Sequence, residues 1–112
     1  MTPKTVLNKS ADLLERQGWY QNGYGRLGPD GIDREGPVCV AGAINLAITD
    51  GKFISHLYTD EERKLKEEVR TILLDTIGGD WEYQGGLVRW NDTPGRTGED
   101  VINTLRRAAD SL

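Results

Sequence analysis

The sequence predicts a small, mainly α-helical domain: a bundle of about four helices with a minor β-hairpin and a long glycine-rich loop. Apolar residues recur at helical spacing in several segments that begin with good capping residues. Glycine and proline gather in one stretch, residues 18–37. A chain of 112 residues is long enough for one hydrophobic core and too short for two. We therefore expect residues 1–112 to form a single domain.

The first helix is expected from residue 3 to residue 17. Thr2 is a favourable N-cap, Pro3 suits the first helical position, and Gly18 is a typical stop. The apolar residues of this segment share one face: Val6, Leu7, Ala11, Leu13 and Leu14. The following loop of about 20 residues contains six glycines and is much longer than an ordinary connection of roughly 4–6 residues. Such a length indicates a loop that is either functional or partly mobile.

The next two helices are expected over residues 37–49 and 60–77. Pro37 can begin the earlier one, and Asp50-Gly51 can end it. Between residues 38 and 48 only Asn45 is strongly polar, which is typical of a central helix covered on most sides. The later one begins with the capping-box pattern Thr59-Asp60-Glu61-Glu62 and ends at Gly78-Gly79.

The C-terminal part of the chain is expected to hold a hairpin and the last helix. Aromatic and β-branched residues alternate in residues 81–83 and 87–90, on either side of Gln84-Gly85-Gly86, which predicts two short paired strands. The last helix should begin at a cap on Thr93 or Thr97. Its inward-facing residues are expected to be Val101, Ile102, Leu105, Ala108 and Ala109.

Composition excludes several function classes. The net charge of −4 gives no support for binding to nucleic acid, and the basic residues of the 60–77 helix are interleaved with glutamates. No apolar run approaches the roughly 20 residues of a membrane span. The N-terminus lacks the pattern of a secretory signal, and the single cysteine cannot form an internal disulfide. We therefore expect a cytoplasmic protein that binds neither membranes nor nucleic acid.

Cys39 is the strongest candidate for catalytic chemistry. Near the start of a helix, backbone N–H groups and the helix dipole favour a thiolate. A nucleophile also needs a base, and the chain has only one histidine, His56, with nothing to show that it returns to Cys39. Because the neighbours of Cys39 are apolar, structural packing is the favoured interpretation. A thiol-dependent enzyme is the alternative.

Residues 18–37 also contain two weak motifs. Gly23-Tyr24-Gly25-Arg26-Leu27-Gly28 matches a dinucleotide-binding fingerprint, but no strand precedes it and a turn follows it. Asp30, Asp33 and Glu35 offer oxygens but lack calcium-loop spacing. One histidine and one cysteine are too few for a zinc or iron site. We expect no cofactor and no metal.

The segment Trp90-Asn91-Asp92-Thr93-Pro94-Gly95-Arg96-Thr97 is the least ordinary part of the sequence. Asn91 and Asp92 can form a turn or cap the next helix, Trp90 can fill the core, and Arg96 can pair with Asp92. The alternative is a recognition surface, since tryptophan and arginine are frequent at binding hot spots. The aromatic residues that include Trp19 gather in the irregular segments, which predicts either a lid over the bundle or an adhesive surface.

Gly18-Trp19, Cys39-Val40-Ala41-Gly42-Ala43 and Trp90-Asn91-Asp92 with Arg96-Thr97 together resemble a family of small uncharacterised proteins of actinobacteria and their phages. The resemblance spans most of the chain and implies a bacterial or phage origin, with no known activity. We therefore expect an accessory protein that is not an enzyme and binds a host or phage protein. The predicted binding residues are Trp19, Trp90, Asn91, Asp92 and Arg96. The sequence leaves a homodimer open.

Overall fold

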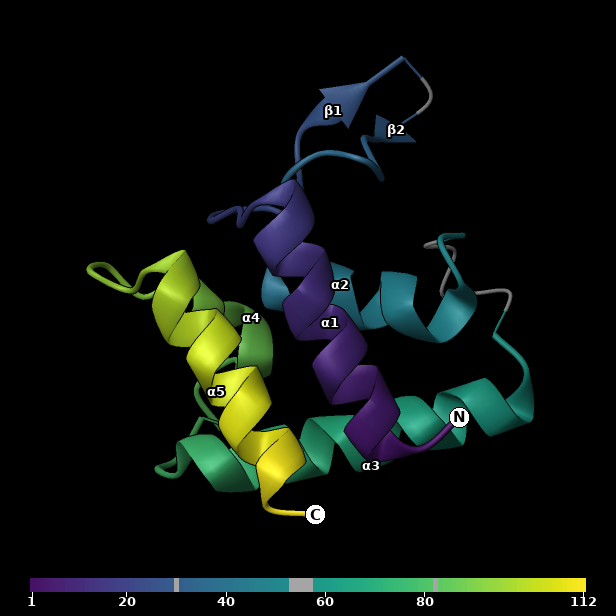
Figure 1. Ribbon diagram of the computed structural model, residues 1–112. Helices are drawn as coiled ribbons and strands as arrows, with labels where there is room; N and C mark the ends of the chain where they lie inside the picture. Colours follow the sequence, from purple (N-terminus) through teal and green to yellow (C-terminus); the bar gives the residue numbers. More distant parts are fainter. Residues whose placement is uncertain (30, 53–57, 82) are drawn as a thin grey trace.

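The computed structural model describes residues 1–29, 31–52, 58–81 and 83–112. In this part of the chain there are five helices and one two-stranded antiparallel hairpin (Figure 1). The helices are α1 (Pro3–Gln17), α2 (Val40–Thr49), α3 (Asp60–Ile77), α4 (Gly86–Asn91) and α5 (Gly98–Asp110). The mainly α-helical class is therefore confirmed.

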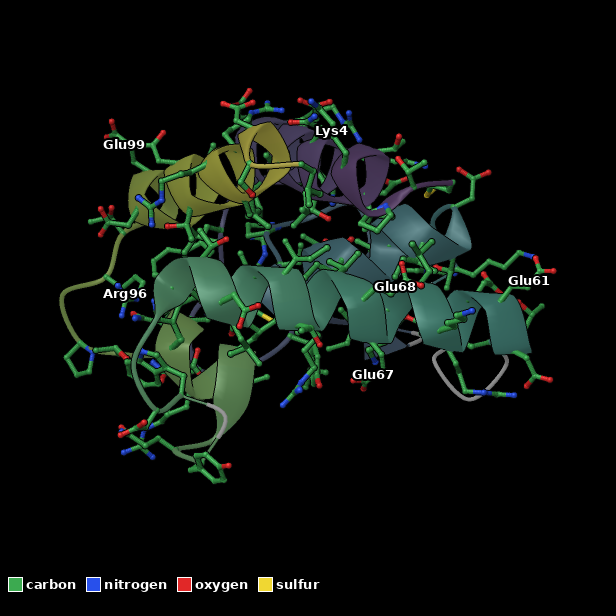
Figure 2. The ribbon with its side chains drawn as sticks, turned by 90° about the horizontal axis from the view of Figure 1, so that it is seen from below. Lys4, Glu61, Glu67, Glu68, Arg96 and Glu99 are labelled. Atoms are coloured by element: carbon green, nitrogen blue, oxygen red, sulfur yellow. The ribbon has the colours of Figure 1, made fainter. Side chains whose placement is uncertain are left out.

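The N-terminal and C-terminal helices form the largest helix pair of the fold. α1 packs most extensively against α5, and its next most extensive contact is with α2. α3 crosses below this layer and contacts α1, α2 and α5 (Figures 1 and 2). The largest fully buried side chains come from these packed faces: Leu7, Leu14, Leu73 and Leu105. The apolar stripes expected from the sequence thus meet in one core.

Capping residues set the helix boundaries. Thr2 caps α1 by accepting a hydrogen bond from the amide of Thr5, at 3.2 Å. Thr59 and Glu62 form the predicted capping box at α3. A second box begins α5, where the Thr97 hydroxyl accepts from the amide of Asp100 at 3.1 Å. Of the two expected caps for this last helix, Thr97 is therefore the one used.

The central helix starts later than the sequence predicts. α2 begins at Val40 instead of Pro37, because residues 38 and 39 bond to the glycine-rich loop. The amide of Val38 donates to the Gly18 carbonyl at 3.2 Å, and the amide of Cys39 donates to the Tyr24 carbonyl at 3.0 Å. All of α2 except Ala41 is buried, as expected for a central helix.

The hairpin lies elsewhere in the chain. Residues 87–90 belong to α4, a short helix, and so the predicted pairing of residues 81–83 with 87–90 is wrong. The observed hairpin consists of β1 (Leu27–Gly28) and β2 (Gly31–Ile32), and it projects from the glycine-rich loop (Figure 1). Positive φ angles at Gly85 and Gly86 carry the chain into α4, where a strand turn was expected.

Candidate functional site

Asn91, at the end of α4, connects three distant segments of the chain. It is completely buried, and its amide group makes four hydrogen bonds. The Oδ1 atom accepts from the Trp19 indole N–H at 2.7 Å and from the Val40 amide at 2.9 Å. The Nδ2 group donates to the Tyr20 carbonyl and to Asp92 Oδ1, both at 3.0 Å. We call these five residues the Asn91 cluster.

The Val40 contact stabilises the start of α2, which the bonds of residues 38 and 39 to the glycine-rich loop already place at Val40. Val40 is the first residue of α2, so its amide has no acceptor within the helix. Because Val40 is fully buried, water cannot replace the missing acceptor. The Asn91 side chain supplies it from α4.

Neighbouring polar contacts tie the glycine-rich loop to the end of α4. The Gln21 side chain donates to the carbonyls of Asn91 and Thr93, at 3.2 and 2.9 Å. Asp92 Oδ1 also accepts from the backbone amide of Asn22 at 2.9 Å. Residues 19–22 are thus held in place by side chains and backbone from the 91–93 segment.

Trp90 and Arg96 form a stacked pair beside this cluster. Trp90 is only 4% exposed and belongs to the core. The Arg96 guanidinium carbon lies 4.4 Å from the centre of the Trp90 ring, and Arg96 Nε donates to the Trp90 carbonyl at 2.7 Å. The guanidinium therefore fixes the connection between α4 and α5 (Figure 2).

The structure brings the five predicted binding residues together, and each has an internal partner. Trp90 and Asn91 are buried, Trp19 packs partly against the core, and Asp92 and Arg96 bond to the backbone. These contacts give the segment a structural role. That the same residues bind a partner stays a prediction. Of the loop aromatics, Trp19 packs against the core, as a lid over the bundle would require, whereas Tyr24 is 44% exposed.

Because α2 begins at Val40, Cys39 is its N-cap, whereas the helix predicted from Pro37 would have placed Cys39 at its third position. Its sulfur accepts a hydrogen bond from the Gly42 amide at 3.4 Å, and the side chain is 1% exposed. Burial raises the pKa of the Cys39 thiol above its ordinary value, because it removes the thiolate from water; the backbone N–H groups of Gly42 and Ala41 act in the opposite direction. These features favour the packing interpretation. His56, the base considered from the sequence, lies outside the described residues.

The acidic residues of the glycine-rich loop serve the loop itself where they are described. Asp33 Oδ1 accepts from the backbone amide of Glu35 at 3.1 Å. Asp30 lies outside the described residues. Across the described ranges, no group of three or more His, Cys, Asp or Glu side chains could hold a metal ion.

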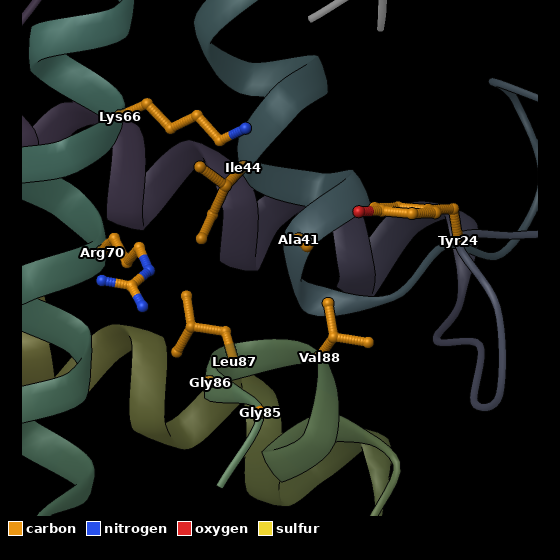
Figure 3. Close-up of a pocket in the computed structure, with 9 residues that line it drawn as sticks. All are labelled: Tyr24, Ala41, Ile44, Lys66, Arg70, Gly85, Gly86, Leu87 and Val88. Atoms are coloured by element: carbon orange, nitrogen blue, oxygen red, sulfur yellow. The ribbon is translucent and has the colours of Figure 1, made fainter. Parts of the chain in front are cut away.

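Sequence reasoning missed a pocket between α2, α3, α4 and the glycine-rich loop (Figure 3). Its volume is about 230 Å³. We call it the cationic pocket and define it by its lining residues: Tyr24, Ala41, Ile44, Lys66, Arg70, Gly85, Gly86, Leu87 and Val88.

The walls of the cationic pocket differ in chemistry. Lys66 and Arg70, one turn apart on α3, form one wall, and Tyr24 lies on the opposite side with its hydroxyl toward them (Figure 3). Apolar side chains from α2 and α4, among them Ile44 and Leu87, lie between these walls. The charged side chains among the described lining residues are both cationic.

A buried polar pair lies next to this pocket. The Tyr58 hydroxyl donates to Asn45 Oδ1, which gives the one strongly polar side chain of α2 a partner. The Lys66 ammonium lies 5.2 Å from the centre of the Tyr58 ring. Burial raises the pKa of Tyr58 to about 12, and the negative charge of Glu62 acts in the same direction. Tyr58 therefore stays a neutral hydrogen-bond donor at physiological pH.

The sequence carries only a weak signal for the cationic pocket. Its residues come from four segments, and Lys66 and Arg70 have the spacing of an ordinary solvated helix face. The signal that was present is the pair Tyr24 and Val88, large apolar residues in or next to segments rich in glycine.

A family model described as a family of unknown function (DUF6197) matches residues 1–111. The chain belongs to this family. Membership in DUF6197 agrees with the resemblance to uncharacterised proteins noted in the sequence and supplies no activity. Comparison of this DUF6197 chain with curated proteins and with solved structures found no match. None of the helices described is both long and apolar enough to cross a membrane.

Proposed function

We propose that this protein is a small bacterial or phage accessory protein that acts in the cytoplasm by binding another protein. The observation that carries the proposal is the cationic pocket together with its exposed apolar rim. Tyr24 is 44% exposed and Val88 is 39% exposed, and both line the pocket. Protein interfaces are commonly centred on a buried apolar patch enriched in aromatic side chains, and the apolar wall of the pocket with Tyr24 at its rim has this composition.

The position of the pocket differs from the surface expected from the sequence. Trp90 is buried and Arg96 is stacked on it, whereas Tyr24 and Val88, which line the pocket, are partly exposed. Both surfaces involve α4, because Val88 and Trp90 belong to that helix. A partner that covers Val88 would therefore lie close to the segment predicted first.

Site-specific photo-crosslinking tests the proposal. Val88 is replaced by p-benzoylphenylalanine and the protein is expressed in an actinobacterial host. Leu27, which is 83% exposed on β1 and does not line the pocket, receives the same replacement as the matched control. We expect a discrete adduct with a host protein from position 88 and none from position 27. Adducts that are absent, or the same at both positions, would contradict the proposal.

A further inference from the structure

We infer that Asn22, in the glycine-rich loop, is a site of spontaneous deamidation, and that its modification loosens the attachment of this loop to the 91–93 segment. Asn22 is exposed and is followed directly by Gly23. The reacting groups are the side-chain amide of Asn22 and the backbone amide of Gly23, and the other reactant is water. The chain therefore holds a modification site that requires no enzyme.

The reaction joins the side chain of Asn22 to the backbone of Gly23. The Gly23 amide nitrogen loses its proton to hydroxide and attacks Cγ of Asn22. A C–N bond forms, and the Cγ–Nδ2 bond breaks as ammonia leaves with a proton from water. Water then opens the cyclic succinimide at one of its two carbonyl groups, which gives aspartate or isoaspartate. In either case one amide and one water become one carboxylate and one ammonium ion.

Three features of the loop leave this pair open to cyclisation. Both residues are exposed, so water and hydroxide reach them. Among the described residues, none accepts a hydrogen bond from the Gly23 amide or bonds to the Asn22 side chain, so the reacting groups have no such bond to break first. Glycine also has no Cβ to obstruct the approach of the Asn22 side chain to the amide nitrogen.

The backbone explains the asparagine of this pair but not the glycine. Asn22 has a φ of 67°, in the left-handed region that asparagine tolerates better than most residues. Gly23 does not have a positive φ, and a Cβ added there would meet the Tyr20 ring at 3.2 Å. A small movement of that ring would accommodate a side chain. Position 23 can therefore be changed to test the chemistry without a change in backbone conformation.

The other four asparagines of the chain are protected. Asn45 and Asn91 are buried, and their side chains are hydrogen-bonded. Asn8 and Asn103 lie inside α1 and α5, where helical hydrogen bonds hold the amide of the following residue. None of the four is followed by glycine. Asparagine is one of the thermolabile residue types, and this chain exposes it to cyclisation at position 22.

Asn22 lies between two anchors of the glycine-rich loop. Its own amide donates to Asp92 Oδ1 at 2.9 Å, and two residues later the Tyr24 carbonyl accepts from the Cys39 amide at 3.0 Å. Isoaspartate adds one carbon atom to the chain between these anchors, so the loop must rearrange. Both products also place a carboxylate at the residue that bonds to Asp92, where the two negative charges repel each other. We therefore expect the modified loop to separate more readily from the 91–93 segment.

Peptide mapping of the aged, complete protein tests the site itself. The protein is incubated at neutral and at mildly alkaline pH, and mass spectrometry locates each deamidated residue and separates isoaspartate from aspartate. We expect modification at Asn22, faster at the higher pH because the Gly23 amide must lose its proton. Asn103 provides the matched comparison in the same sample, since it is exposed but helical, and its rate should be lower by about tenfold or more.

Two variants separate the chemistry from the structure. Gly23→Ala retains Asn22 but adds a Cβ beside the reacting nitrogen, so its deamidation should be slower by about tenfold or more. Asn22→Gly removes the reacting side chain and suits the φ of 67° at that position, so it should fold and remain unmodified. Circular dichroism checks the folding of both variants. If Gly23→Ala does not fold, the comparison of Asn22 with Asn103 in the unaltered chain still decides the question.

Hydrogen exchange measures the consequence for the loop. Ion exchange separates the modified protein from the fresh protein, because deamidation adds one negative charge to a net charge of −4. We expect the backbone amides of residues 22 and 39, which make the two anchoring bonds, to exchange several-fold faster in the modified protein. The amides of α3 should be unchanged, and aged Asn22→Gly should show no difference from the fresh variant.

Several results would overturn the inference. An aged protein that stays unmodified at position 22, or that is modified equally fast at Asn22 and Asn103, would refute the site. Equal rates in the unaltered chain and in folded Gly23→Ala would refute the cyclisation. Unchanged exchange at residues 22 and 39 in the modified protein would refute the loosening of the loop.

Discussion

Replacement of Asn91 by alanine should strongly destabilise the protein, although the side chain is small and carries no charge. The variant Asn91→Ala removes all four hydrogen bonds of the amide group. The Val40 amide is then left without an acceptor in a fully buried position, which costs about 1–3 kcal/mol. The lost bonds to Trp19 and Tyr20 are each worth about 0.5–1.5 kcal/mol. We expect a total loss of about 4 kcal/mol.

A loss of this size is a large share of the stability of a domain, which is usually about 5–15 kcal/mol. Urea unfolding followed by tryptophan fluorescence measures it directly. At about 4 °C per kcal/mol, the melting temperature should fall by about 16 °C. The indole proton of Trp19 gives a local signal, because its resonance in the NMR spectrum should move and exchange faster with solvent once Asn91 Oδ1 is absent.

The matched control is Asn103→Ala, which removes an asparagine from an exposed position of α5. It should change the free energy of unfolding by no more than about 0.5 kcal/mol. If the two variants differed by less than about 1 kcal/mol, the buried amide would not hold the three segments together and the reasoning would be refuted.

Three further predictions concern single positions. Because burial raises the pKa of the Cys39 thiol, Cys39 should resist iodoacetamide at pH 8 in the folded protein and react fully in urea. Equal alkylation rates in the two states would contradict the burial of Cys39. The contribution of the neutral thiol to stability should be present below about pH 9 and decline above it. Absorbance at 295 nm should show one tyrosine that ionises near pH 12, and Tyr58→Phe should remove that step. The contribution of neutral Tyr58 to stability should be retained below about pH 10 and lost as the pH rises toward 12. Gly25→Ala should lower the free energy of unfolding, measured by chemical denaturation, by about 1–3 kcal/mol, since the added Cβ would lie 2.8 Å from the Pro37 carbonyl oxygen. The control Gly28→Ala should lower it much less, because the Cβ added there would lie 3.6 Å from its nearest atom. Similar losses of stability in the two variants would argue against a steric cause.

The sequence predicts the longer helices well because their signals are local. Thr59 and Glu62 lie one turn apart and specify the start of α3 by themselves, and the stripe of Leu65, Val69 and Leu73 continues it. α4 carries no such signal. Its six residues include β-branched and aromatic side chains that suit a strand equally well, and its packing against the rest of the fold decides the outcome.

The candidate site could be predicted only in part. The sequence singles out Trp90, Asn91 and Arg96, and it considers a local turn or cap for Asn91. The actual hydrogen bonds reach Trp19 and Val40, 72 and 51 residues away. Such long-range pairs depend on how the helices pack. The cationic pocket was missed for the same reason, since its walls come from segments that no local pattern connects.

The pairing of α1 with α5 determines when this protein can fold. The first and the last helix share the most extensive contact among the described elements, and the buried faces of both contribute to the core. During synthesis, the apolar face of α1 must therefore wait until residues 98–110 have left the ribosome before it can meet its main partner. We expect the nascent chain to remain without a stable core until α5 has left the ribosome, with the apolar face of α1 open to association with other chains until then.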